Sequence, residues 1–202
     1  MVTTVGRLIV FEGPDGVGKT SLSVALKNHF ASKEIPCELL SFPGKEDGTL
    51  GKLVYDVHHK MDQFGIKSID PTSLQLLHVA AHIDCIEKKI LPGLRMGKQI
   101  ILDRYWWSTV VYGRLSNCNQ NSIQRMIEAE RTHWGATKPH VVFLIRRILS
   151  DAENGSRSLL VSGYQEVAAV EMNNYPVSTI DNNGRIEESG ANIIAKLDEI
   201  SK

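Results

Sequence analysis

The sequence predicts an α/β fold in which a five-stranded parallel sheet is flanked by helices. Short apolar runs of strand length alternate along the chain with longer segments whose apolar residues recur at helical spacing. Strands that are apolar throughout are typical of a parallel sheet, because helices cover both of its faces. A Gly-rich segment between the first apolar run and the first helical segment agrees with this, since ligands bind at such strand ends.

The expected strands are apolar runs separated by helical patterns. In order along the chain they are residues 7–12, 36–41, 99–103, 140–145 and 177–181. The first contains Leu8-Ile9-Val10-Phe11, an unbroken apolar run that is typical of a buried strand.

The expected helices lie between these strands and are amphipathic. They are roughly residues 19–33, 48–59, 72–89, 121–134, 164–173 and 187–201. In the third, the apolar residues that repeat at helical spacing are Leu76, Leu77, Ala80, Ala81 and Ile83. The sequence has no internal repeat, low-complexity tract or Pro/Gly-rich linker, so we expect residues 1–202 to form one domain.

Composition narrows the class of protein. The chain has 202 residues, and 23 Lys and Arg balance 23 Asp and Glu. Because no long run of one sign occurs, strong attraction to nucleic acid or to a membrane is not expected. The three cysteines, Cys37, Cys85 and Cys118, lie outside any CxxC spacing and are typical of reduced thiols. With no apolar stretch of signal-peptide or membrane-spanning length, we expect a cytoplasmic protein.

Residues 13–20 form a complete phosphate-binding loop pattern. Its glycines let backbone N–H groups turn toward phosphate oxygens, and the helix N-terminus adds its positive dipole end. Lys19 can reach the β- and γ-phosphates, and the Thr20 hydroxyl can hold Mg²⁺. The pattern predicts a nucleoside triphosphate site, and a Gly-rich turn without a ligand is the alternative. The expected nucleotide-binding residues are Gly13, Pro14, Asp15, Gly16, Val17, Gly18, Lys19, Thr20 and Ser21.

A second informative segment is Asp103-Arg104-Tyr105, which ends the strand at 99–103. An Asp at the end of an apolar strand is typical of the residue that positions Mg²⁺ beside the nucleotide in phosphate-loop proteins. Arg104 adds a guanidinium that can bind a phosphate through two hydrogen bonds. An Asp–Arg ion pair that merely caps the strand is the alternative.

Several segments together resemble the thymidylate kinases, which have a three-layer P-loop NTPase fold. The phosphate loop has an Asp where that family has one, and Asp103-Arg104-Tyr105 with Ser108 resembles the family's DRY…S segment. Further similar segments follow in the family's order: Phe42-Pro43 with Lys45, and residues 48–51, 76–97, 138–144 and 180–188. This order, kept across nearly the whole chain, is much more specific than the loop alone.

The resemblance implies transfer of the γ-phosphoryl group of ATP to the 5′-phosphate of a nucleoside monophosphate, with dTMP as the expected acceptor. Because such a transfer needs mainly positioning and neutralisation of charge, Lys, Arg and Mg²⁺ dominate the site. The expected catalytic residues are Lys19, Asp103, Arg104 and Arg157, with Thr20 and Asp103 at the metal. Asp15 would accept a hydrogen bond from the acceptor's 3′-hydroxyl, and Lys45 stands where the family usually has an arginine.

Residues 147–162 are the expected lid, because family members without a basic residue in the phosphate loop supply arginines from such a segment. Gly155 and the nearby serines predict that it is mobile. Arg157 is the expected transition-state arginine, with Arg146 and Arg147 behind it. A solvated surface arginine is the alternative.

By resemblance, the acceptor site consists of Asp15, Phe42, Lys45, His78, His82, Arg104, Ser108 and Tyr112. His78 and His82 stand where the family has a stacking aromatic ring and a base-binding arginine, one helical turn apart. An imidazole can stack and can donate a hydrogen bond, so a pyrimidine fits. Two ordinary, partly buried histidines are the alternative. Zinc is not expected, because the segment from His78 to His82 lacks the Glu of the metalloprotease motif.

Several functional hypotheses remain open at this point. The first is dTMP phosphorylation, and a close second is the same chemistry on another deoxynucleotide, because the base-reading residues differ from the family's. A deoxynucleoside kinase would need a carboxylate base, for which Glu12 is the candidate. A degenerate homologue would bind ATP without turnover. A GTPase switch is not expected, because the Asn-Lys-x-Asp guanine reader is absent. The resemblance further implies a homodimer whose ligands are small-molecule nucleotides.

Overall fold

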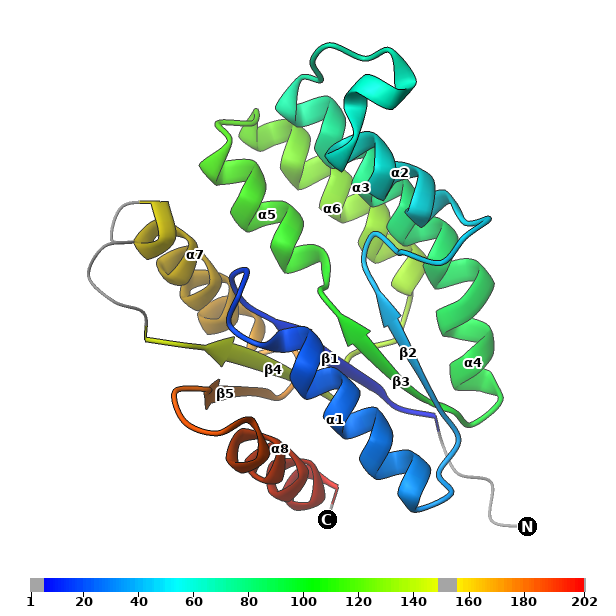
Figure 1. Ribbon diagram of the computed structural model, residues 1–202, viewed down its shortest axis with the longest axis vertical. Helices are drawn as coiled ribbons and strands as arrows, with labels where there is room; N and C mark the ends of the chain where they lie inside the picture. Colours follow the sequence, from blue (N-terminus) through cyan, green and yellow to red (C-terminus); the bar gives the residue numbers. More distant parts are fainter. Residues whose placement is uncertain (1–5, 149–155, 202) are drawn as a thin grey trace.

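The fold is built on a five-stranded parallel sheet, shown in Figure 1. The computed structural model describes residues 6–148 and 156–201. The strands are β1 (Leu8–Glu12), β2 (Cys37–Ser41), β3 (Gln99–Asp103), β4 (Val141–Arg146) and β5 (Val177–Asp181). They pair in the order β2-β3-β1-β4-β5, and every pair is parallel. The predicted α/β fold with a five-stranded parallel sheet is therefore confirmed.

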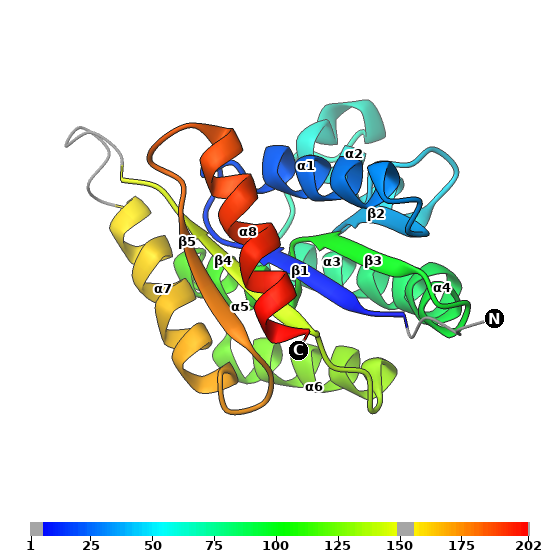
Figure 2. The same ribbon diagram turned by 90° about the horizontal axis from the view of Figure 1, so that it is seen from below.

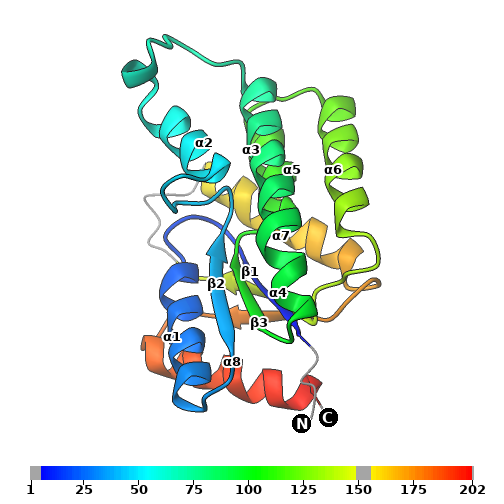
Figure 3. The same ribbon diagram turned by 90° about the vertical axis from the view of Figure 1, so that its right-hand side faces the viewer.

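Helices cover both faces of the sheet (Figure 2). On one face lie α1 (Lys19–Ser32) and α8 (Ile186–Ile200). The other face carries α3 (Pro71–Cys85), α5 (Trp106–Leu115), α6 (Gln120–Trp134) and α7 (Ser156–Glu171). A shorter helix, α2 (Leu50–His59), lies beside α3, as Figure 3 shows. Three short elements complete the order: the 3₁₀ helix η1 (Met61–Phe64), the π-helical turn η2 (Ile86–Ile90) and α4 (Leu91–Arg95).

The strands are apolar throughout because each face of the sheet has its own core. In β1, Leu8 and Val10 pack with α3, α5, α6 and α7, whereas Ile9 and Phe11 pack with α1 and α8. Successive side chains of a strand point to opposite faces, so a strand buried on both sides has no polar positions to alternate. β1 is fully buried along its whole length.

Three of the described helices have a short polar side chain as their N-terminal cap. Asp70 accepts hydrogen bonds from the backbone N–H groups of Thr72 and Ser73 at the start of α3. Thr49 caps α2 and Asn119 caps α6 in the same way. These caps satisfy N–H groups that have no partner inside the helix, and they fix where each helix begins.

The helices differ from the predicted ones at three places. We predicted no helix between the third strand and residue 121, yet α5 lies there. Most residues of α5 are buried, so the segment has no polar face from which an amphipathic pattern could be read. The helix predicted at 72–89 passes through η2 into α4. The helix predicted to begin at residue 164 begins instead at Ser156.

The carboxyl ends of β1, β3 and β4 lie next to one another at one edge of the sheet. Side chains and loops that follow these strands are therefore brought together, as is usual for ligand sites in open parallel sheets. No helix in the described ranges is long and apolar enough to cross a membrane.

Candidate active site

The phosphate loop connects β1 to α1 and depends on glycine at three positions. Gly13, Gly16 and Gly18 have φ values of 135°, 76° and 97°, a region that side chains disfavour. A Cβ on Gly13 would lie 2.3 Å from the Ile145 carbonyl oxygen, and one on Gly18 would lie 2.4 Å from Asn182 Nδ2. The loop is thus packed tightly against β4 and against the segment after β5.

Asn182 holds this loop in place, and the sequence analysis assigned it no role. Its side-chain Nδ2 donates to the Val17 carbonyl oxygen at 2.8 Å, and the residue is buried. This bond ties the phosphate loop to the segment that follows β5.

Lys19 lies inside the loop rather than in solvent. Its Nζ donates to the Pro14 carbonyl oxygen at 2.7 Å, and only 5% of the residue is exposed. Burial, and after it the nearby Arg104 guanidinium, lower the pKa of Lys19 from 10.5 to about 8. An anion bound in the loop would offset both effects, so the site favours a phosphate.

Thr20 and Asp103, the two residues predicted at the metal, are hydrogen-bonded to each other. The Thr20 hydroxyl donates to Asp103 Oδ2 at 2.6 Å, and the other carboxylate oxygen, Oδ1, is buried without a hydrogen-bond partner among the described residues. A hydroxyl beside a buried carboxylate oxygen fits Mg²⁺, which prefers oxygen ligands and takes the remainder from phosphates and water. Within the described ranges, no three His, Cys, Asp or Glu side chains are grouped as a metal site.

Asp15, Arg104, Ser108 and Tyr112 form one hydrogen-bonded group at the mouth of the loop. Arg104 forms an ion pair with Asp15 through Nη2 and donates from Nη1 to Ser108 Oγ at 3.1 Å. The Tyr112 hydroxyl donates to the other Asp15 oxygen at 2.7 Å. Burial alone would raise the pKa of Asp15, but Arg104, Tyr112 and Lys19 together outweigh it and hold the pKa below its usual range. Asp15 is therefore an ionised hydrogen-bond acceptor.

Glu12 holds Ser108, a member of this hydrogen-bonded group, in place from the end of β1. The sequence analysis did not predict this role. The carboxyl group of Glu12 accepts hydrogen bonds from the backbone N–H groups of Tyr105 (2.7 Å) and Ser108 (3.1 Å) and from the Ser108 hydroxyl (2.9 Å). Burial raises the pKa of Glu12 from 4.5 to about 7. The available signal was a charged residue at the end of a fully apolar strand.

Tyr164 of α7 reaches the same group, although the sequence analysis gave it no role at the site. Its hydroxyl lies 2.8 Å from Ser108 Oγ and is buried. Ser108 thereby connects α7 to both Glu12 and Arg104.

Two adjoining cavities open at this edge of the sheet. A cavity of about 420 Å³ is lined by all eight residues predicted for the acceptor: Asp15, Phe42, Lys45, His78, His82, Arg104, Ser108 and Tyr112. A cavity of about 430 Å³ lies over the phosphate loop and is lined by residues that include Lys19, Thr20, Asp103 and Arg147. Asp15, Phe42, Lys45 and Arg104 line both. A group transferred between the two cavities would pass these four side chains.

Histidines dominate one wall of the acceptor cavity, and two of them, His58 and His59, come from α2 and were not predicted. His78 Nε2 lies 3.2 Å from His58 Nδ1. Burial, together with His82 and His58, lowers the pKa of His78 from 6.5 to about 3, so it is neutral at neutral pH. The His82 ring stacks on Phe42 with ring centroids 4.0 Å apart.

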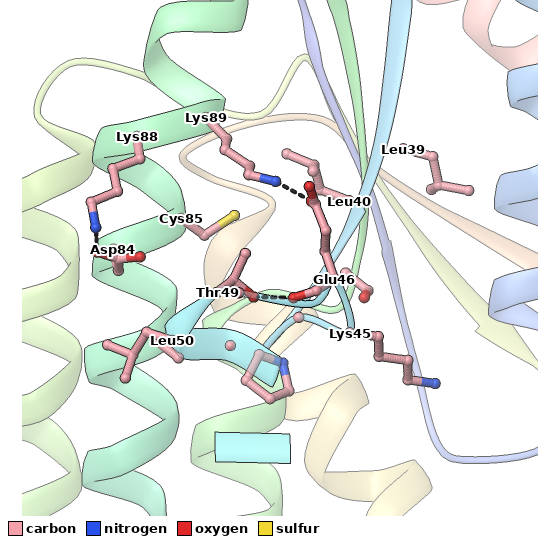
Figure 4. Close-up of a pocket in the computed structure, with 16 residues that line it drawn as sticks. Leu39, Leu40, Lys45, Glu46, Thr49, Leu50, Asp84, Cys85, Lys88 and Lys89 are labelled. Carbon is pink, nitrogen blue, oxygen red and sulfur yellow. Dashed lines mark hydrogen bonds and ion pairs between the residues drawn. The ribbon is translucent and has the colours of Figure 1, made fainter. Parts of the chain in front are cut away.

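Lys45 is one of the residues that line a third cavity, of about 350 Å³, between residues 39–51 and α3, but its side chain extends away from that cavity (Figure 4). In that cavity Lys89 is paired with Glu46, and Lys88 with Asp84 at 2.6 Å. Lys45 Nζ lies over the Tyr55 ring, 5.0 Å from its centroid, on the acceptor side. Its charge is therefore available to the acceptor cavity.

Arg157 contacts the phosphate loop, but from a helix and not from a loop. Its Nη2 donates to the Asp15 carbonyl oxygen at 3.0 Å. Within the predicted lid, residues 149–155 lie outside the described residues, and α7 begins at Ser156. Arg147 lines the cavity over the loop, whereas Arg146 is paired with Asp181 at 2.9 Å at the ends of β4 and β5.

Comparison with known proteins identifies the family. The family model described as thymidylate kinase matches residues 11–157. The thymidylate kinase of Rickettsia typhi is 32% identical over 143 residues, which cover 70% of this chain and 65% of that protein. The thymidylate kinase of Neorickettsia sennetsu is 29% identical over 137 residues, which cover 68% and 64% of the two chains. The chain thus spans less than two thirds of the length of these curated relatives.

The fold is also that of a solved thymidylate kinase. The crystal structure of the enzyme from Ehrlichia chaffeensis superposes with a TM-score of 0.76, covering 95% of this chain and 98% of that chain at 22% identity. Together with the phosphate loop, the Thr20–Asp103 pair and the family match over most of the sequence, this leads to one conclusion. The chain belongs to the thymidylate kinase family.

Proposed function

We propose that this protein transfers the γ-phosphoryl group of ATP to the 5′-phosphate of a deoxynucleoside monophosphate, with dTMP as the acceptor and dTDP as the product. The observation that carries the proposal is the pair of adjoining cavities that share Lys45 and Arg104. Donor and acceptor phosphates that meet there bring concentrated negative charge, which these two cations would neutralise.

The roles of the residues follow from their positions. Lys19 would bind the β- and γ-phosphates of ATP, and Thr20 with Asp103 would hold Mg²⁺. When bound, Mg²⁺ neutralises charge on the phosphates and fixes their geometry. Arg104, held by Asp15 and Ser108, would bridge the two phosphate groups. The chemistry therefore depends on positioning and charge and requires no protein nucleophile.

On the acceptor side, the Asp15 carboxylate would accept a hydrogen bond from the 3′-hydroxyl of the sugar, with Tyr112 beside it. Arg157, which now binds a carbonyl of the loop, would act on the transferred group once a nucleotide is present. A homodimer and a cytoplasmic location belong to the same proposal and are supported by the family alone. Because His78 and His82 replace the base contacts usual in the family, another deoxynucleotide is the second candidate acceptor.

The test is an ADP-release assay with ATP, Mg²⁺ and a panel of ribo- and deoxynucleoside monophosphates. Lys19→Ala is the inactivating variant, and Lys27→Ala, an exposed lysine on the same helix, is the matched control. We expect turnover on dTMP that is lost in the first variant and kept in the second. Turnover on a different monophosphate would replace the substrate, and no turnover with ATP still bound would overturn the proposal in favour of a binding protein.

A further inference from the structure

A buried carboxylate lies behind the acceptor cavity and contacts one of its histidines. Glu130 belongs to α6, is fully buried, and accepts from Trp134 Nε1 at 3.3 Å through Oε1. Its other oxygen, Oε2, lies 2.9 Å from His82 Nδ1. The two helices involved, α3 and α6, lie side by side (Figure 3). Neither the sequence motifs nor the family resemblance gives Glu130 a role.

The surroundings of His82 leave its ring one orientation. The ring lies parallel to Phe42, with an interplanar angle of 9°, and edge-on to His78 at 6.3 Å. Trp134 is itself held edge-on by Tyr105 at 5.2 Å. Because Nδ1 is turned toward Glu130, Nε2 is the ring nitrogen left for the cavity, and it has no hydrogen-bond partner among the described residues.

We propose that Glu130 is a positioning residue that fixes His82 in the Nδ1–H tautomer, so that Nε2 presents a hydrogen-bond acceptor to the acceptor's base. This inference rests on the proposed function, and it deepens it by naming the base. A neutral imidazole carries one N–H, and an ionised carboxylate can only accept, so the proton is held at Nδ1. An acceptor at Nε2 matches the N3–H of thymine or uracil and opposes the lone pair at N3 of cytosine.

The variant Glu130→Gln reverses this arrangement without removing the side chain. The indole N–H of Trp134 can only donate, so it would form its hydrogen bond with the amide oxygen of the glutamine. The amide NH₂ then faces His82 Nδ1, which must become an acceptor, and the proton moves to Nε2. The cavity would present a donor where the native protein presents an acceptor. Glu128→Gln, the same change on the exposed side of α6, is the matched control.

The first measurement is steady-state kinetics at about pH 8 with dTMP, dUMP and dCMP. In Glu130→Gln we expect the ratio of kcat/KM for dTMP to that for dCMP to fall by about tenfold or more. The change should lie in KM for the acceptor, with KM for ATP unchanged. A smaller fall, or an equal loss for all three acceptors, would show that Glu130 serves only the packing of the core and would overturn the inference.

The second measurement reads the tautomer directly and needs no turnover. Long-range proton–nitrogen NMR of the native protein distinguishes Nδ1–H from Nε2–H, and His82→Gln identifies which of the seven histidine signals belongs to His82. We expect Nδ1–H in the native protein, and Nε2–H there would overturn the inference even if the variant fails to fold. If no monophosphate is phosphorylated, the proposed function fails, while the NMR result still decides the role of Glu130.

Discussion

The buried carboxyl group of Glu12 should make the stability of the protein depend on pH. It lies in the sheet core between the phosphate loop and the start of α5, and burial raises its pKa from 4.5 to about 7. A raised pKa means that the native state binds the proton more tightly than the unfolded state does. This contribution to stability is therefore complete below about pH 4.5 and is lost as the pH rises through about 7.

The size of the effect follows from the two pKa values. One pKa unit corresponds to about 1.4 kcal/mol, so the rise from 4.5 to about 7 amounts to about 3 kcal/mol in the free energy of unfolding. Glu12→Gln removes the titration and keeps an oxygen that can accept from Tyr105 and Ser108. Relative to the native protein, the variant should gain about 3 kcal/mol between pH 4.5 and about pH 8.

Urea unfolding of both proteins across this pH range measures the difference, with Glu128→Gln as the exposed control. The quantity of interest is the slope of the difference with pH, because loss of the Ser108 hydroxyl contact at the other oxygen shifts the stability of the variant by a constant amount. Parallel profiles for the native protein and Glu12→Gln would refute the reasoning. They would mean that Glu12 binds its proton equally well in the native and unfolded states, so that its pKa is not raised on folding.

Three further predictions concern the loop and the core. Gly18→Ala places a Cβ 2.4 Å from Asn182 Nδ2 at a φ of 97°, so calorimetric binding of ATP should weaken by about tenfold or more; unchanged affinity would contradict it. Asn182→Ala removes the 2.8 Å hydrogen bond to the Val17 carbonyl oxygen and should lower the free energy of unfolding by about 1–2 kcal/mol in urea titrations. Tyr175→Phe leaves the buried indole N–H of Trp107 without its 3.0 Å partner. It should lower stability by a similar amount, about 1–2 kcal/mol, while KM for both substrates stays the same. Loss of activity there without loss of stability would be inconsistent with a purely structural contact.

The features that local sequence carries were predicted correctly. Each strand is a continuous apolar run, and a parallel sheet covered on both faces requires such runs. The phosphate loop could be recognised from its glycines. The structure shows why they are needed, because Gly16 and Gly18 have φ values of 76° and 97°, which most other residues avoid. The residues predicted for the acceptor were chosen through motif order, and all of them line one cavity.

What the sequence concealed depends on contacts between distant segments. Glu130 reads as one more charged residue of an amphipathic helix, and its partner His82 lies 48 residues away. Helix α5 was missed because packing on nearly every side removes the polar face that marks a helix. Arg157 was assigned to a mobile loop, although the helix that carries it already begins at Ser156.

The most direct test of the central claim follows the phosphoryl group itself. ATP labelled in its γ-phosphate is incubated with the protein, Mg²⁺ and dTMP, and the labelled products are separated. The account predicts label in dTDP that is absent without dTMP. The label should also be absent in Lys19→Ala, because the ammonium group that neutralises the phosphates has been removed. Label that stays in ATP, or that appears only as inorganic phosphate, would contradict the claim that this site transfers a phosphoryl group to a nucleotide.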